Sequence, residues 1–126
     1  MKGKVLALDY GRKMVGLASG DLETRMAFPR EVIVNKGVND LVEKVLSLCA
    51  DLKIVLVVLG MPAVENVICA EIEALAGLLR ARGIDVKFVD EDFSSIEAEQ
   101  MVDGAFGGRL DANAAQIILQ RFFNNY

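Results

Sequence analysis

The segment from 53 to 59 constrains the fold of this chain more than any other. It reads Lys-Ile-Val-Leu-Val-Val-Leu, with no polar residue between Ile54 and Leu59, and the turn formers Gly60-Met61-Pro62 close it. A strand of this kind has no face for water, so it is typical of a parallel sheet that is covered on both faces. The segment therefore predicts an α/β fold.

Apolar periodicity elsewhere predicts the remaining elements. Two short apolar runs around the turn 10–13 indicate a hairpin, and later segments alternate between helical and strand periods. Asn66 is the expected N-cap of the second helix and Gly83 its end. The expected strands are 4–9, 14–20, 28–34, 53–59 and 86–89, and the expected helices are 38–52, 66–83, a short one after Ser94, and 114–123.

This order of elements predicts a mixed five-stranded sheet with helices on both faces. The chain has 126 residues, of which 53% are hydrophobic and 25% charged, so residues 1–126 are expected to form a single domain. The net charge of -4 argues against binding nucleic acid by bulk electrostatics. The chain has no histidine, which excludes Ser-His triads and histidine metal sites.

The two cysteines and the apolar runs bear on the compartment. Cys49 and Cys69 fall inside predicted helices without CxxC spacing, so they are expected to be buried thiols in a reducing compartment. The first apolar run ends at Asp9, too early for a signal peptide, and the run 54–59 is too short to cross a bilayer. We expect a soluble cytoplasmic protein with no membrane partner.

Three acidic residues stand where predicted elements end or begin. Asp9 ends the first strand, Glu91 follows the strand 86–89, and Asp111 stands just ahead of the last helix. Because ligands gather outside the carboxyl ends of parallel strands, we expect the three carboxylates to lie within roughly 8 Å of one another. Such a cluster suits Mg²⁺ or Mn²⁺, which would orient a water and stabilise the leaving oxygen of a phosphodiester.

Each acid also has a simpler interpretation. Asp9 could be a turn former at the end of its strand, and Asp111 could be the N-cap of the last helix. Glu91 lies in the short acidic run 90–92, which is typical of a solvated loop. On local grounds alone, these alternatives stay open.

The turn after Asp9 supplies candidate contacts to substrate. Arg12 and Lys13 would approach a phosphate backbone, and Gly11 would let substrate come near the strand end. Arg109 is a further cation near the proposed acids. Alternatively, Gly11 only permits the hairpin turn, and the two cations of the turn are ordinary exposed charges.

In order, four segments resemble the signatures of the YqgF/RuvX family: 9–16, 60–62, 89–91 and 111–120. The resemblance covers essentially the whole chain, and the last segment is its most specific part. It implies an RNase H-like fold related to Holliday-junction resolvases. It also implies a divalent-metal-dependent nuclease that matures the 5′ end of the small-subunit ribosomal RNA precursor. By position, it carries the acidic roles onto Asp9, Glu91 and Asp111.

The chain departs from the family pattern in three places. Asp92 stands where a basic residue commonly follows the Asp-Glu pair, and the turn 63–66 is short where the family has a longer loop. The segment 104–110 lacks the lysines that often precede the last acid. Since all three changes remove cationic or polar contacts, they weaken the expected grip on a phosphate backbone.

The sequence therefore predicts a nuclease whose partner is nucleic acid, structured RNA in preference to DNA junctions, and whose context is a ribosomal precursor particle. We expect a monomer or a weak homodimer. One alternative is a Holliday-junction-resolvase-like DNA nuclease. The other is a non-catalytic RNase H-like protein that contacts ribosomal or transcription machinery through its acidic surface; metal-dependent cleavage of an RNA precursor separates it from the nuclease.

The scarcity of cations near the acids leads to a prediction about salt. With Arg12, Lys13 and Arg109 as the nearby cations, the slope of log affinity against log salt for duplex substrate should be shallower than about -3, because each phosphate contact contributes about -0.9. Fluorescence anisotropy of the Asp9→Asn protein at several salt concentrations measures this slope. A slope of about -6 or steeper would reveal an extended basic surface and contradict the expectation.

Overall fold

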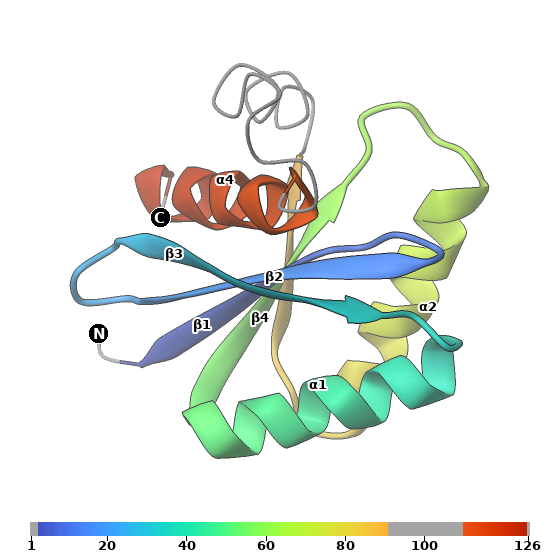
Figure 1. Cartoon of the computed structure of the whole chain (residues 1–126), viewed down its shortest axis with the longest axis horizontal. Coiled ribbons are helices and arrows are strands. Elements are labelled where there is room, and N and C mark those ends of the chain that lie inside the picture. The colour runs from blue at the N-terminus through green and yellow to red at the C-terminus, as the bar shows by residue number, and fades with distance from the viewer. Residues whose placement is uncertain (1–2, 91–109, 126) are drawn as a thin grey trace.

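A mixed five-stranded sheet forms the middle layer of the molecule, with helices on both faces, as predicted (Figure 1). The structure is a computed structural model that describes residues 3–90 and 110–125, with side chains in the second range described from Asn113. The strand order is β3-β2-β1-β4-β5. The strands are β1 (Lys4–Asp9), β2 (Met14–Asp21), β3 (Ala27–Val34), β4 (Ile54–Met61) and β5 (Val86–Asp90), and the helices are α1 (Val38–Leu52), α2 (Val67–Ala81) and α4 (Leu110–Asn124).

β1 is the middle strand and is buried on both faces. It pairs antiparallel with β2 and parallel with β4. Leu6 and Leu8 pack into the apolar cluster under α1 and α2, whereas Val5 and Ala7 pack into the cluster under α4. The alternation of a strand thus gives each helical layer its own half of β1.

β4 confirms the prediction of a strand buried on both faces. It pairs parallel with β1 on one side and with β5 on the other, and Leu56 to Gly60 are buried. The strand continues through Gly60 and Met61, which the sequence indicated as its terminator. Met61 pairs with Asp90, so the ladder to β5 carries β4 two residues beyond the expected end at Leu59.

The helix α2 has the caps that the sequence indicated. The side chain of Asn66 accepts a hydrogen bond of 2.7 Å from the backbone N–H of Ile68. The helix ends at Ala81, and Gly83 has a φ of 87°, a conformation that favours glycine. The short helix predicted after Ser94 lies outside the described residues.

The helix α4 begins earlier than the periodicity indicated. It starts at Leu110 instead of Ala114, so Asp111 lies inside the first turn and not ahead of the helix. The expected position of Asp111 was therefore wrong. The prediction failed because it began the helix at the first residue of its apolar face, whereas the polar and small residues 111–113 belong to the helix as well.

Two glutamines of α4 fasten it to the start of β3. Gln120 accepts from the backbone N–H of Ala27 and donates to the carbonyl of Arg25, while Gln116 donates to the carbonyl of Ala27. Phe123 lies against Gly20 in β2. Earlier residues of α4 therefore bond later residues of β3, so α4 and β3 run in opposite directions. Since β2 is antiparallel to both β1 and β3, β3 is parallel to β1, and α4 runs antiparallel to β1.

Both cysteines are buried and free, as expected. Burial raises the pKa of the Cys49 thiol to about 11. Within the described residues, no helix is long and apolar enough to cross a membrane.

The raised pKa of Cys49 gives stability a dependence on alkaline pH. The folded protein keeps this thiol neutral, so its contribution is complete below the ordinary pKa of 9.0 and is lost as the pH rises toward about 11. Urea unfolding at two pH values, about 8 and about 10.5, should therefore show a larger fall in stability for the natural protein than for Cys49→Ala. Equal falls in the two proteins would show that Cys49 is not the group responsible.

Glycines 20 and 77 form a matched pair for testing the packing of α4. A Cβ at Gly20 would collide with the carbonyl oxygen of Met26 and lie 2.6 Å from the Phe123 ring, whereas one at Gly77 in α2 would meet nothing within 4 Å. Gly20→Ala should destabilise the protein by about 1–3 kcal/mol. Gly77→Ala should stabilise it by about 0.5–1 kcal/mol. Urea unfolding measures both, and a neutral Gly20→Ala would contradict the close contact.

Candidate active site

Asp9 lies at the carboxyl end of the middle strand, as the sequence predicts. Val5 and Ala7 face α4, so strand alternation puts the side chain of Asp9 on that same face. It is half-buried. Gly16 of β2 stands directly opposite, and Gly60 of β4 lies one residue beyond the Leu8–Leu59 pair, so neither neighbouring strand covers Asp9 with a side chain.

The first turn of α4 lies toward the same end of the sheet. Since α4 runs opposite to β1, its beginning, which contains Asp111, is directed toward the carboxyl end of β1. Figure 1 shows α4 lying across the face of the sheet that α1 and α2 leave uncovered. The backbone therefore agrees with a meeting of Asp9 and Asp111, although the side chain of Asp111 is not among those described.

Glu91 and Arg109 lie outside the described residues, so the three-acid site stays a prediction. Asp90, the residue before Glu91, pairs with Met61, and its carbonyl accepts a hydrogen bond of 3.1 Å from Arg121 Nη1, in the last turn of α4 and not in the first turn, which contains Asp111. A pocket of about 250 Å³ lies between the end of β5 and the last turns of α4. Its lining residues are Phe88, Val89, Asp90, Arg121, Phe122 and Asn125.

Among the described side chains, no three acids or cysteines form a group able to hold a metal ion. Of the predicted trio, only the carboxylate of Asp9 belongs to that set. Its chemistry fits Mg²⁺ or Mn²⁺, because both ions prefer oxygen ligands and are commonly held by one or two carboxylates together with water and phosphate.

The turn between β1 and β2 requires glycine at position 11. A Cβ there would lie 2.5 Å from the carbonyl oxygen of Met14. The Gly11 carbonyl accepts a hydrogen bond of 2.8 Å from Asn35 Nδ2, and the backbone N–H of Asn35 donates to the Lys13 carbonyl. These contacts explain the glycine at position 11 by the geometry of the turn alone. Its role in letting substrate approach therefore stays a prediction.

Arg12 is bound to a carboxylate that the sequence analysis did not single out. Its Nη2 lies 2.6 Å from Oε2 of Glu71 in α2, and its Nε lies 3.0 Å from the same oxygen. The hydroxyl of Tyr10 donates to the other oxygen of Glu71 at 2.8 Å. Glu71 is 59 positions from Arg12, so no local pattern could have indicated the pair. Lys13 is exposed.

The contacts around Glu71 shift the ionisation of all three groups. Hydrogen bonds from Arg12 and then Tyr10 lower the pKa of the Glu71 carboxyl. The same bond to Glu71 raises the pKa of Arg12. Burial, followed by the bond to Glu71, raises the pKa of Tyr10. At neutral pH the group is therefore a neutral phenol, a guanidinium and a carboxylate, with no net charge.

A family model described as RuvX, Holliday junction resolvase, matches residues 3–125. Two relatives carry the provisional name pre-16S rRNA nuclease. The one from Ralstonia pickettii is 37% identical and covers 100% of this chain and 90% of its own length. The one from Ralstonia nicotianae is 38% identical and covers 97% of this chain and 87% of its own length.

Solved structures confirm the RNase H-like fold. RuvC of T. thermophilus in complex with a Holliday junction substrate matches with a TM-score of 0.63 at 16% identity, covering 98% of this chain and 94% of RuvC. The Fowlpox virus resolvase in complex with Holliday junction DNA matches with a TM-score of 0.65 at 10% identity, covering 97% of each chain.

Proposed function

The chain belongs to the RuvX family, a family of nucleases, and from that premise we propose that it uses a divalent metal to process the 5′ end of pre-16S rRNA. One observation carries the proposal: the carboxylate of Asp9 stands at the end of the middle strand, on the face of the sheet that α4 covers. The first turn of α4 is directed toward that same end of the strand. That is where this fold can gather acids from separate elements.

The residues fit a site for Mg²⁺ or Mn²⁺. Asp9, Glu91 and Asp111 would hold the ion, which when bound supplies positive charge to the reacting phosphate. Asp9 contributes a carboxylate that the strand end holds in place, half-buried and next to two glycines. Lys13, exposed in the adjacent turn, would contact a phosphate of the backbone, and Arg109 remains a further candidate for such a contact from the sequence.

RNA is the favoured substrate because the relatives that match at 37–38% identity over nearly their whole length are named for pre-16S rRNA. The resemblance to junction-bound resolvases, at 10–16% identity, concerns the fold. We therefore propose that the chain acts in the cytoplasm on structured RNA within a ribosomal precursor particle, as a monomer or a weak homodimer.

A second candidate function is cleavage of four-way DNA junctions. The description of the matching family model favours it, since that description names a Holliday junction resolvase. Both substrates present phosphodiester backbones to the same acids, so comparing cleavage of a pre-16S rRNA fragment and a four-way DNA junction separates the two.

The Asp9→Asn variant tests the proposal. The amide keeps the size of the side chain but loses the charge that holds a divalent cation, so cleavage should be abolished while the melting temperature stays nearly unchanged. Cleavage of a labelled pre-16S rRNA fragment in Mg²⁺ and in Mn²⁺, together with a thermal melt, measures both.

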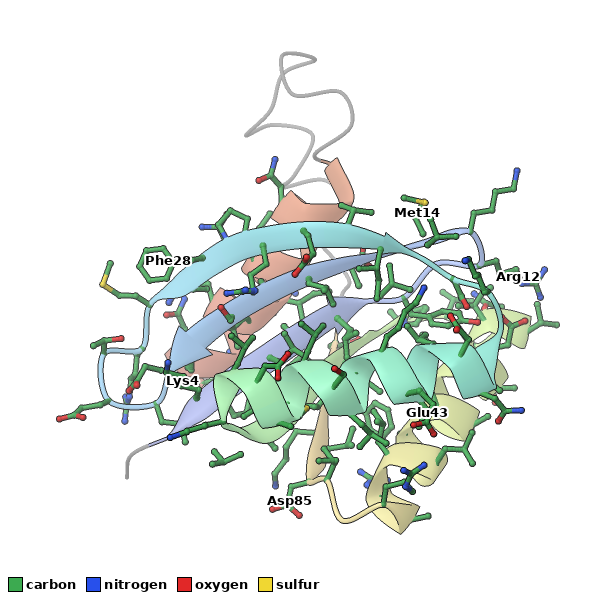
Figure 2. The ribbon with its side chains drawn as sticks, turned by 60° about the horizontal axis from the view of Figure 1, so that its bottom comes forward. Lys4, Arg12, Met14, Phe28, Glu43 and Asp85 are labelled. Atoms are coloured by element: carbon green, nitrogen blue, oxygen red, sulfur yellow. The ribbon has the colours of Figure 1, made fainter. Side chains whose placement is uncertain are left out.

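Asp85→Asn is the matched control. Asp85 is an exposed aspartate just before β5, at the opposite end of the sheet from Asp9, and Figure 2 shows it well away from the turn that carries Arg12. This variant makes the same chemical change and should keep full activity. Retained cleavage by Asp9→Asn together with a large loss of stability would show that Asp9 is structural.

A further inference from the structure

We propose that Glu71 determines how strongly the turn after Asp9 attracts nucleic acid, because it holds Arg12 and neutralises its charge. The inference rests on the proposed nuclease function and assigns a role to a residue outside the acidic site. It makes Lys13 the cation that this turn offers to phosphate while the pair of Arg12 and Glu71 is intact.

The carboxylate of Glu71 is engaged from the turn at both of its oxygens. Oε2 accepts hydrogen bonds from Arg12 Nη2 at 2.6 Å and from Arg12 Nε at 3.0 Å. Oε1 receives the Tyr10 hydroxyl at 2.8 Å and lies 3.3 Å from Arg12 Nε. One side chain of α2 therefore holds the residues on either side of Gly11, in the turn that directly follows Asp9.

This pairing removes most of the attraction that Arg12 would have for a phosphate. A phosphate that takes Arg12 must displace Glu71, and the displaced carboxylate then lies unpaired beside a polyanion. The new contact is therefore opposed by the repulsion of a like charge at close range. In contrast, an Arg12 without that neighbour would add one full phosphate contact.

The pair is nevertheless open to solvent, so the effect is adjustable. The side chains of Arg12 and Glu71 are 58% and 33% exposed. Nucleic acid can thus reach the guanidinium, and removing the charge of Glu71 should not unfold the protein, since exposed ion pairs contribute little to stability. Glu71 weakens binding through this turn without blocking it.

The test measures binding of a pre-16S rRNA fragment containing a duplex by fluorescence anisotropy, from about 50 to 200 mM salt, with every protein carrying Asp9→Asn so that nothing is cleaved. Adding Glu71→Gln should tighten binding and steepen the slope of log affinity against log salt by about 0.9, the contribution of one duplex phosphate contact. The gain in affinity from Glu71→Gln should then shrink about three- to fourfold between the lowest and the highest salt concentration. Glu71→Ala should behave alike.

Arg12→Ala completes the cycle. Alone it should change affinity less than about twofold, and combined with Glu71→Gln it should cancel the whole gain, since the gain belongs to the released guanidinium. A merely structural role of Glu71 would alter folding or the melting temperature but would not make the salt slope depend on Arg12.

Glu43→Gln is the matched control for net charge. Glu43 of α1 pairs with Arg82 at 2.9 Å, also on the surface. Arg82 follows the end of α2, eleven residues after Glu71, or about 16 Å along the helix at about 1.5 Å per residue. The variant makes the same change in net charge and frees an arginine far from the turn, so it should leave the salt slope unchanged.

The outcomes separate the two proposals. Three results, each obtained while RNA binds, would overturn the role of Glu71 and leave the nuclease function standing. The first is a slope of log affinity against log salt that Glu71→Gln leaves unchanged, and the second is a slope that Arg12→Ala alone makes shallower by about 0.9. The third is an effect of Glu43→Gln equal to that of Glu71→Gln. If the Asp9→Asn protein binds neither RNA nor a DNA junction at any salt concentration, the proposed function falls, and the role of Glu71 falls with it.

Discussion

The burial of β1 on both faces is the constraint on which the rest of the structure depends. Four consecutive residues, Val5 to Leu8, have no exposed surface, and each helical layer takes two of them. An ionised carboxylate inside such a strand would cost several kcal/mol. After this buried stretch, Asp9 is the first position at which the strand can again carry a charge, and there it is half-buried, in reach of solvent and of a cation.

The end of this strand serves both faces of the sheet. Asp9 is directed to the α4 side, and the next residue, Tyr10, packs against the cluster under α1 and α2 and bonds Glu71. Asn35 holds the same turn through the Gly11 carbonyl. The acid and the supports of its turn thus lie on opposite sides of the sheet, so residues of α2 can affect the turn without occupying the side where a metal would bind.

Much of the fold could be predicted because each element carries its own pattern. The short apolar run of β1, the longer apolar run of β4 and the Asn66 cap are local signals, and all three were confirmed. The predicted first residue of α4 was wrong because the helix includes polar and small residues ahead of its buried face. The partner of Arg12 could not be predicted, since the contact with Glu71 exists only once the folded chain brings the turn between β1 and β2 to α2.

The way in which α4 covers the sheet has a consequence for synthesis of the chain. Val5, Ala7 and Ala18 belong to the first two strands, yet the apolar partners that α4 gives them are made only after all five strands: Ala115, Ile118, Leu119 and Phe123. During translation the α1 and α2 layer can assemble on one face while the other still exposes its apolar side chains. Such a half-covered sheet exposes apolar surface of the kind that promotes aggregation, and this face is closed only after α4 has left the ribosome.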